Sequence, residues 1–141
     1  TNMKRKMVSV ALCAAMTAGV LAGGAVTVSA EDKLVVYGIY KAGDQTWFID
    51  EGAAAQKAVE EAGGEFVYVD AKMNPEEYLK AIDNAIANKA SGIVTCIPDQ
   101  TMSQAAIDKA EEAGIPIVAA DDALQDAEGN KACSMGRNRR L

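Results

Sequence analysis

Four short apolar runs alternate with helix-like stretches along this chain, and the alternation sets its fold class. The runs cover residues 34–40, 66–69, 93–97 and 115–120, and their starts lie 32, 27 and 22 residues apart. Leu34–Tyr40 is almost continuously apolar, which fits a parallel strand covered on both faces better than a half-exposed one. A strand–helix–strand unit takes about 30 residues. The chain is therefore predicted to form an α/β, Rossmann-like lobe around a parallel sheet.

The stretches between the runs show the periodic apolar positions of amphipathic helices. The first helix is predicted over Thr46–Ala62 and ends at Gly63-Gly64, because glycine accepts the left-handed conformation that closes a helix. The second begins at Asn74-Pro75, which are residue types preferred as N-cap and first helical residue. Its expected buried side consists of Tyr78, Leu79, Ile82 and Ile86. The third ends at Gly114, and its apolar stripe consists of Met102, Ala106, Ile107, Ala110 and Ala113.

The N-terminus has the features of a secretory signal peptide. Positive charge in Met3-Lys4-Arg5-Lys6 precedes an uncharged stretch, and Val28-Ser29-Ala30 supplies small or branched residues for cleavage. Residues 1–30, with a two-residue leader before Met3, are predicted to be removed by cleavage before Glu31. A membrane anchor is the alternative, because the uncharged stretch is long. Its Ala, Gly, Thr and Ser content favours cleavage, so the protein is expected to be periplasmic or exported.

Composition and motifs exclude several classes of function. All 20 acidic residues follow residue 30, and the whole chain has a net charge of −6, which makes nucleic acid an unsuitable partner. Cys96 and Cys133, which remain after cleavage, are too widely spaced for a typical metal site, so no metal is predicted. The sequence contains no histidine, no nucleophile motif and no phosphate-binding glycine loop. The chain is therefore predicted not to be an enzyme, and no cofactor is expected.

Polar and aromatic residues follow three of the predicted strands. Lys41, Trp47 and Phe48 come after the first strand, Cys96 lies at the end of the third, and Asp121-Asp122 follow the fourth. Ligands of α/β sheets bind outside the carboxyl ends of the strands. A sugar site pairs a few charged groups that bond to hydroxyls with an apolar surface that covers the ring. This edge of the sheet is therefore predicted to bind a sugar.

Each of these residues also has a structural interpretation. Phe48 is the more natural core anchor of the helix start, whereas Trp47 is equally compatible with a core role and a ligand role. Lys41 on its own reads as a solvated loop residue, and Cys96 as a small buried hydrophobe. Asp121 or Asp122 is also of a residue type that caps a following helix.

Three segments together carry a resemblance to a known family: KLVVYGIYKAGDQTWF, SGIVTCIPDQ and IPIVAADDALQDAEG. They resemble the N-terminal lobe of the periplasmic type I sugar-binding proteins of ABC transporters, and among these the L-arabinose-binding proteins. The shared pattern is a lysine before Trp-Phe, a Cys-x-Pro-Asp turn and an Asp-Asp pair. In that family two Rossmann-like lobes close over a monosaccharide, and the complex docks on a membrane permease.

The resemblance implies a set of ligand contacts: Lys41, Trp47, Phe48, Cys96, Asp121 and Asp122. Asp122 is expected to hold the ring oxygen or the anomeric hydroxyl. Gln45 is a further candidate, and it stands where arabinose-binding proteins have a glutamate, so an arabinose- or galactose-like sugar is expected without a choice between them. Residues 31–129 are predicted to be a truncated N-terminal lobe. Residues 130–141 show no helical stripe or alternation and are predicted to be a disordered or aberrant tail.

The predicted function is that of the substrate-binding subunit of a sugar ABC transporter, which delivers a monosaccharide to a membrane permease. Two alternatives share the fold class. The effector domain of a LacI-type transcription regulator is disfavoured by the signal peptide and by the lack of a helix-turn-helix segment. An exported flavodoxin-like enzyme is disfavoured because no catalytic constellation is visible in the sequence.

Overall fold

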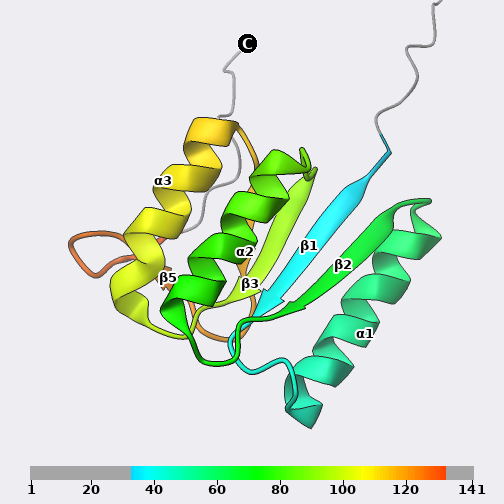
Figure 1. Cartoon of the computed structure of the whole chain (residues 1–141), viewed down its shortest axis with the longest axis horizontal. Helices are drawn as coiled ribbons and strands as arrows, with labels where there is room; N and C mark the ends of the chain where they lie inside the picture. The colour runs from blue at the N-terminus through cyan, green and yellow to red at the C-terminus, as the bar shows by residue number, and fades with distance from the viewer. Residues whose placement is uncertain (1–32, 133–141) are drawn as a thin grey trace, which may run out of the picture. The chain divides into compact units, whose positions relative to one another are not determined.

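A computed structural model describes residues 33–132, which form a parallel sheet with helices on both faces (Figure 1). The elements in chain order are β1 (Val35–Tyr40), α1 (Thr46–Glu61), β2 (Glu65–Asp70), α2 (Pro75–Ala87), β3 (Gly92–Cys96), η1 (Gln100–Met102), α3 (Ser103–Ala113), β4 (Ile117–Ala119), β5 (Leu124–Gln125) and β6 (Lys131–Ala132). The four main strands are parallel in the order β2-β1-β3-β4, which confirms the predicted Rossmann-like sheet. The predicted signal peptide, residues 1–30, lies outside the described residues.

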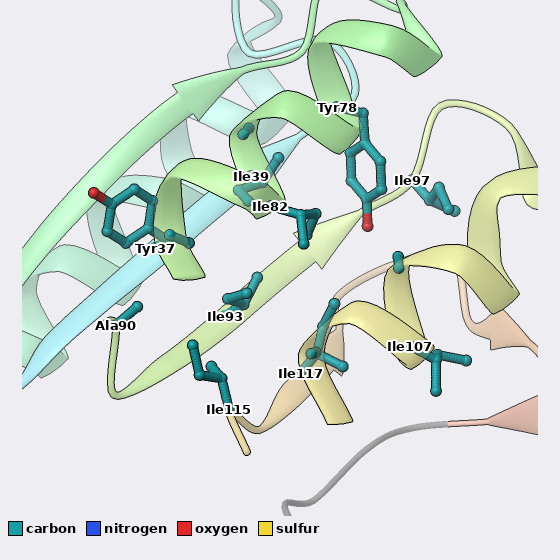
Figure 2. Packing of buried hydrophobic residues seen from close by; sticks show 14 of the residues in the cluster. Tyr37, Ile39, Tyr78, Ile82, Ala90, Ile93, Ile97, Ile107, Ile115 and Ile117 are labelled. Atoms are coloured by element: carbon teal, nitrogen blue, oxygen red, sulfur yellow. The ribbon is translucent and has the colours of Figure 1, made fainter. Parts of the chain in front are cut away.

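The larger core lies between the sheet and the pair α2 and α3, which stand side by side in Figure 1. Figure 2 shows side chains from β1, β3 and β4 meeting side chains from these two helices. Tyr78 and Ile82 of the predicted α2 stripe are fully buried, whereas Leu79 and Ile86 are half-buried. The remaining buried positions of α2 are alanines, Ala81 and Ala85. Small residues there allow the helix to lie close to the sheet.

Helix α1 covers the opposite face of β1 and β2 over a smaller cluster. Tyr40, Phe48 and Cys96 are buried in it, and Phe66 packs against its side. Gly52 of α1 lies so close to β2 that a Cβ atom there would be 2.3 Å from the Tyr68 ring. The small residues predicted on this helix stripe therefore do permit a close approach, and at Gly52 the approach requires glycine.

Local sequence signals determine the helix ends. The Asn74 side chain accepts hydrogen bonds from the backbone N–H groups of Glu76 and Glu77 at 2.8 and 3.2 Å, and Pro75 is the first residue of α2. Gly63 and Gly114 adopt left-handed φ values of +79° and +71° after α1 and α3. These caps confirm the predicted starts and stops. One difference is that α1 ends at Glu61 rather than Ala62. Of the stripe predicted for the third helix, Met102 lies in η1 and Ala113 is exposed.

Strand β4 is shorter than predicted, because it begins at Ile117 rather than at Ile115. The Ile115 N–H is already bonded to the Ala110 carbonyl as part of the α3 terminus. Pro116 has no N–H, although its carbonyl accepts a bond from Ile93 of β3. Only the residues after Pro116 can therefore enter the ladder with both backbone groups.

A short hairpin follows β4, where the sequence predicted a tail without structure. β5 and β6 pair antiparallel, and the Asp126 carboxylate accepts hydrogen bonds from the N–H groups of Glu128 and Asn130 in the connecting loop. The prediction of disorder is therefore wrong for Lys131 and Ala132, whose strand pairing is set by the loop. Residues 133–141 of that predicted tail lie outside the described residues.

Within residues 33–132, no helix combines the length and the apolar composition that crossing a membrane requires.

Candidate functional site

The sheet register brings three of the predicted segments to one edge. Tyr40, the last residue of β1, pairs with Cys96, the last residue of β3. Thr95 pairs with Ala119 at the end of β4, and its carbonyl also accepts a bond from the Ala120 N–H. The residues that follow these strands therefore emerge side by side, as expected for the carboxyl edge of a parallel sheet.

An ion pair between Lys41 and Asp122 lies at the centre of this edge. The Lys41 Nζ is 2.5 Å from the Asp122 Oδ2, although the two residues are 81 positions apart in sequence. The same oxygen accepts the Cys96 thiol at 3.8 Å, and Lys41 Nζ lies 5.9 Å from the centre of the Phe48 ring. The hydrogen bond to Asp122 raises the pKa of Lys41, partly offset by burial. Lys41 is therefore a half-buried, fixed cation rather than a solvated loop residue.

Asp121 lies next to this pair in an unusual backbone conformation, with φ at +68°. Its carboxylate, the Asp122 carboxylate and the Cys96 sulfur lie within 4.8 Å of one another. Such a set has the composition of a metal site, but the Lys41 ammonium already neutralises Asp122. Burial raises the pKa of the Cys96 thiol, with a smaller opposing effect from a hydrogen bond with the Asp122 backbone. The Lys41–Asp122 pair therefore places a hydrogen-bond donor and a charged acceptor side by side at this edge.

Trp47 and Asp121 line an open groove together with Asp50 and Glu51, and its volume is about 510 Å³. This volume is within the range of small-molecule sites. The indole of Trp47 is 65% exposed, so it is not a core anchor. Phe48 is 3% exposed and is the anchor, as its structural interpretation proposed. Burial raises the pKa of Glu51, and the charge of Asp121 raises it further.

One further candidate from the sequence, Gln45, is not bonded to the ion pair in the described part of the chain, and one structural interpretation from the sequence is wrong. Gln45 occupies the N-cap position of α1, but its side chain is exposed and does not cap the helix. Within residues 33–132 its side chain makes no hydrogen bond to the Lys41–Asp122 pair. The idea that Asp121 or Asp122 caps a following helix is wrong, because β5 follows them.

Three residues at this edge were not singled out from the sequence. Tyr40 is fully buried between the Phe48 and Tyr68 rings, with ring centres 5.8 and 5.2 Å away, and burial raises its pKa to about 12. Its hydroxyl has no hydrogen-bond partner among the described residues. Strand alternation after Ile39 would have placed Tyr40 on the α1 face. Asp50 and Glu51 follow Trp47 at helical spacing, which is the signal that would have placed them on its face.

Comparisons with known proteins agree with this fold. The L-arabinose-binding periplasmic protein of Escherichia coli is 33% identical over 91 residues, which are 64% of this chain and 27% of that protein. An ABC transporter L-arabinose-binding periplasmic protein of Azospirillum brasilense is 32% identical with the same coverage of both chains. A solved ABC transporter solute-binding protein of Actinobacillus succinogenes, with bound D-allose, is 25% identical with a TM-score of 0.62. It is matched over 69% of this chain and 34% of its own.

The chain spans 27% of the length of these two curated relatives. The family described as "Periplasmic binding protein domain" matches residues 35–138, which include every described strand and helix. The resemblance inferred from the three sequence segments is thus confirmed, and the chain belongs to the family of periplasmic binding protein domains.

Proposed function

We propose that this chain is the sugar-binding lobe of a solute-binding protein that serves an ABC importer. It binds an arabinose- or galactose-like monosaccharide in the periplasm for delivery to a membrane permease. The observation that carries the proposal is the Lys41–Asp122 pair beside the exposed Trp47, at the carboxyl edge of the sheet. The names of the two curated relatives support it, since both are L-arabinose-binding periplasmic proteins and one is named as an ABC transporter protein.

The ion pair offers both kinds of bond that a sugar needs. A hydroxyl can donate to the Asp122 carboxylate, and a neighbouring hydroxyl can accept from the Lys41 ammonium. Lys41 and Cys96 both contact Oδ2 of Asp122, and within residues 33–132 Oδ1 accepts no hydrogen bond. Bonds to charged groups are shorter and stronger than neutral ones. A vicinal diol therefore fits the pair without leaving either charge unpaired.

Trp47 supplies the apolar part of the site. Its indole stands at the rim of the groove, where it can cover the C–H face of a sugar ring. Burying exposed aromatic surface contributes roughly 25 cal/mol per Å² of apolar area removed from water. The ring lies on the first turn of α1, whose next residue, Phe48, is fixed in the cluster below. The stacking surface is therefore held by a buried neighbour rather than by a free loop.

Titration of the 141-residue chain with L-arabinose, D-galactose, D-xylose and D-ribose tests the proposal. Trp47 is the single tryptophan of the chain, so its emission reports directly on the site. Saturable changes in Trp47 emission, accompanied by backbone NMR shifts at Lys41 and Asp122, are expected with at least one sugar. An unchanged spectrum at millimolar concentrations of all four sugars would contradict the proposal.

Substitution at the pair, in a version that also carries the second lobe expected for this family, gives a ranked prediction. Asp122→Ala is expected to weaken binding by about 1–3 kcal/mol, because it removes a charged acceptor and strands the hydroxyls bonded to it. Trp47→Ala should have a similar or smaller effect, and Lys41→Ala the smallest, because water replaces part of its bonding. Asp83→Ala is the matched control, since Asp83 pairs with Lys109 at 2.7 Å outside the site. Equal sugar affinity of Asp122→Ala and Asp83→Ala would refute the assignment.

Export is a separate part of the proposal. Cleavage before Glu31 is expected when the chain is produced in a bacterium with an outer membrane, because of the basic start and the Val28-Ser29-Ala30 site. N-terminal sequencing of the periplasmic fraction is the measurement. An uncleaved chain recovered with the membranes would contradict it.

A further inference from the structure

Lys41 begins the connection after β1, and Trp47 lies in the first turn of α1, which follows it. The position of this connection relative to β4 determines whether the site forms. We propose that Tyr68 and Asp70, at the end of β2, are positioning residues for this connection. They hold Gly43 and thereby fix the Lys41 ammonium and the first turn of α1. We call these two residues the β2 clamp. The inference rests on the proposed function, since it concerns the same sugar site.

The clamp binds both polar backbone groups of one residue. The Gly43 N–H donates to Asp70 Oδ1 at 2.7 Å, and the Tyr68 hydroxyl donates to the Gly43 carbonyl at 2.8 Å. Gly43 is buried against Asp70, and a Cβ atom at this position would lie 2.6 Å from the Asp70 Cβ and 2.9 Å from its Cα. The turn therefore approaches β2 as closely as a glycine allows.

The loop after β2 reinforces the contact. Asp70 Oδ1 also accepts the Lys72 N–H at 2.8 Å, and the Met73 N–H donates to the Lys41 carbonyl at 2.5 Å. Lys72 and Met73 have left-handed φ values of +53° and +54°. Side-chain-bearing residues seldom adopt this conformation, and it persists where surrounding contacts impose it. The strained loop is thus shaped to hold the backbone of Lys41 itself.

The clamp also continues into the aromatic floor of the site. The Tyr68 ring stacks on Tyr40 with centres 5.2 Å apart, and Tyr40 packs against Phe48 at 5.8 Å. Lys41 Nζ lies 5.9 Å from the Phe48 ring centre. Tyr68 is therefore connected to the site by two routes, through its hydroxyl to the Gly43 backbone and through the Tyr40 ring to Phe48. Side chains of β2 therefore fix the geometry of the sugar-contacting edge, although β2 contributes none of the predicted ligand contacts.

Tyr68→Phe and Asp70→Ala test the clamp, and Tyr37→Phe is the matched control. Tyr37 is also in the sheet, and its hydroxyl accepts a hydrogen bond from Asn88 at 2.8 Å, distant from the carboxyl edge. Sugar affinity is measured by titration with the same four sugars, below the unfolding transition of each variant. Time-resolved anisotropy of Trp47 measures the motion of the first turn of α1 without any sugar.

Tyr68→Phe is expected to bind about 3–10-fold more weakly than the parent chain, which is the equivalent of one lost hydrogen bond. Asp70→Ala should bind at least as weakly, because it also removes the bond to the Lys72 N–H. Their Trp47 anisotropy should show more rapid local motion. Asp70→Asn keeps an oxygen acceptor and should lie closer to the parent. Tyr37→Phe should lower thermal stability while leaving sugar affinity and Trp47 motion unchanged.

Two results separate the clamp from the proposed function. If Tyr68→Phe and Asp70→Ala match Tyr37→Phe in affinity and in Trp47 motion, the clamp is refuted and these residues are only structural. If the parent chain binds none of the four sugars, the proposed function is refuted. Trp47 anisotropy then decides alone whether Tyr68 and Asp70 fix the first turn of α1.

Discussion

The hydrogen bond between the Thr95 and Tyr78 hydroxyls gives the most demanding test of the packing of the larger core. Both side chains are fully buried in the larger core. Thr95 Oγ1 is 2.9 Å from the Ile39 carbonyl oxygen and 3.0 Å from the Tyr78 hydroxyl. The single proton of Thr95 serves the carbonyl, so Tyr78 donates to Thr95. Burial raises the pKa of Tyr78 to about 12, which keeps this donor protonated.

Thr95→Val preserves the shape of the side chain and removes the acceptor of Tyr78. A stranded buried hydroxyl costs about 1–3 kcal/mol, whereas Tyr78→Phe loses one hydrogen bond at about 0.5–1.5 kcal/mol. Thr95→Val is therefore expected to be the more harmful of the two substitutions. The double variant should be less destabilised than the sum of both, because no hydroxyl remains to be stranded.

Denaturant unfolding of the four proteins measures these differences, and thermal unfolding checks them. For a domain of 60–100 residues, 1 kcal/mol corresponds to a shift in Tm of about 4–8 °C. Additive effects of the two substitutions, or a Thr95→Val variant as stable as Tyr78→Phe, would refute the account of the buried pair. Thr95 also precedes Cys96, so the result tests how firmly the end of β3 is fixed beneath the site.

Two further predictions concern single positions near the site. Burial raises the pKa of the Glu51 carboxyl above 4.5, so the protonated carboxyl favours folding at acid pH. This stabilisation is lost as the pH rises through the pKa of Glu51 in the folded state. Glu51→Gln should therefore raise Tm more at pH 7 than at pH 4. Equal shifts at both pH values would contradict this. Gly43→Ala should destabilise by about 1–3 kcal/mol in denaturant unfolding, because its Cβ would meet the Asp70 backbone. Gly92→Ala, whose Cβ would lie 3.8 Å from the Pro116 carbonyl oxygen in ordinary contact, is the control and should retain parental stability.

Much of the architecture could be predicted because its signals are local. The apolar run of β1, the Asn74-Pro75 start of α2 and the glycine after α3 each act through neighbouring backbone groups, so their residue types suffice. The start of β4 could not be predicted this way. The N–H of Ile115 is hydrogen-bonded to the Ala110 carbonyl at the end of α3. This bond forms only when the helix end is complete, so no local residue pattern predicts it.

The sequence predicted that the candidate residues lie at one edge of the sheet, but it did not predict how they are arranged there. The order of the parallel strands brings Lys41 and Asp122 to one edge, but their direct pairing depends on how the chain bends after β4. The groove beside Trp47 was missed because its acidic walls come from α1 and from Asp121, which are 70 positions apart. The β5–β6 hairpin was missed because strands of two residues carry no alternation for a pattern to detect.

The left-handed backbone conformation of Asp121 means that positions 121 and 122 accept different sets of residue types. At φ +68° only glycine, asparagine and aspartate are readily accommodated, so position 121 is restricted by the main chain before any ligand is considered. Position 122 has no such restriction and is held by its pairing with Lys41. Asparagine at position 121 removes a charge and tolerates the bend, whereas alanine removes the charge and is strained at this φ. The residue type at position 121 is thus limited by backbone conformation, whereas the one at position 122 is limited by its ion pair with Lys41.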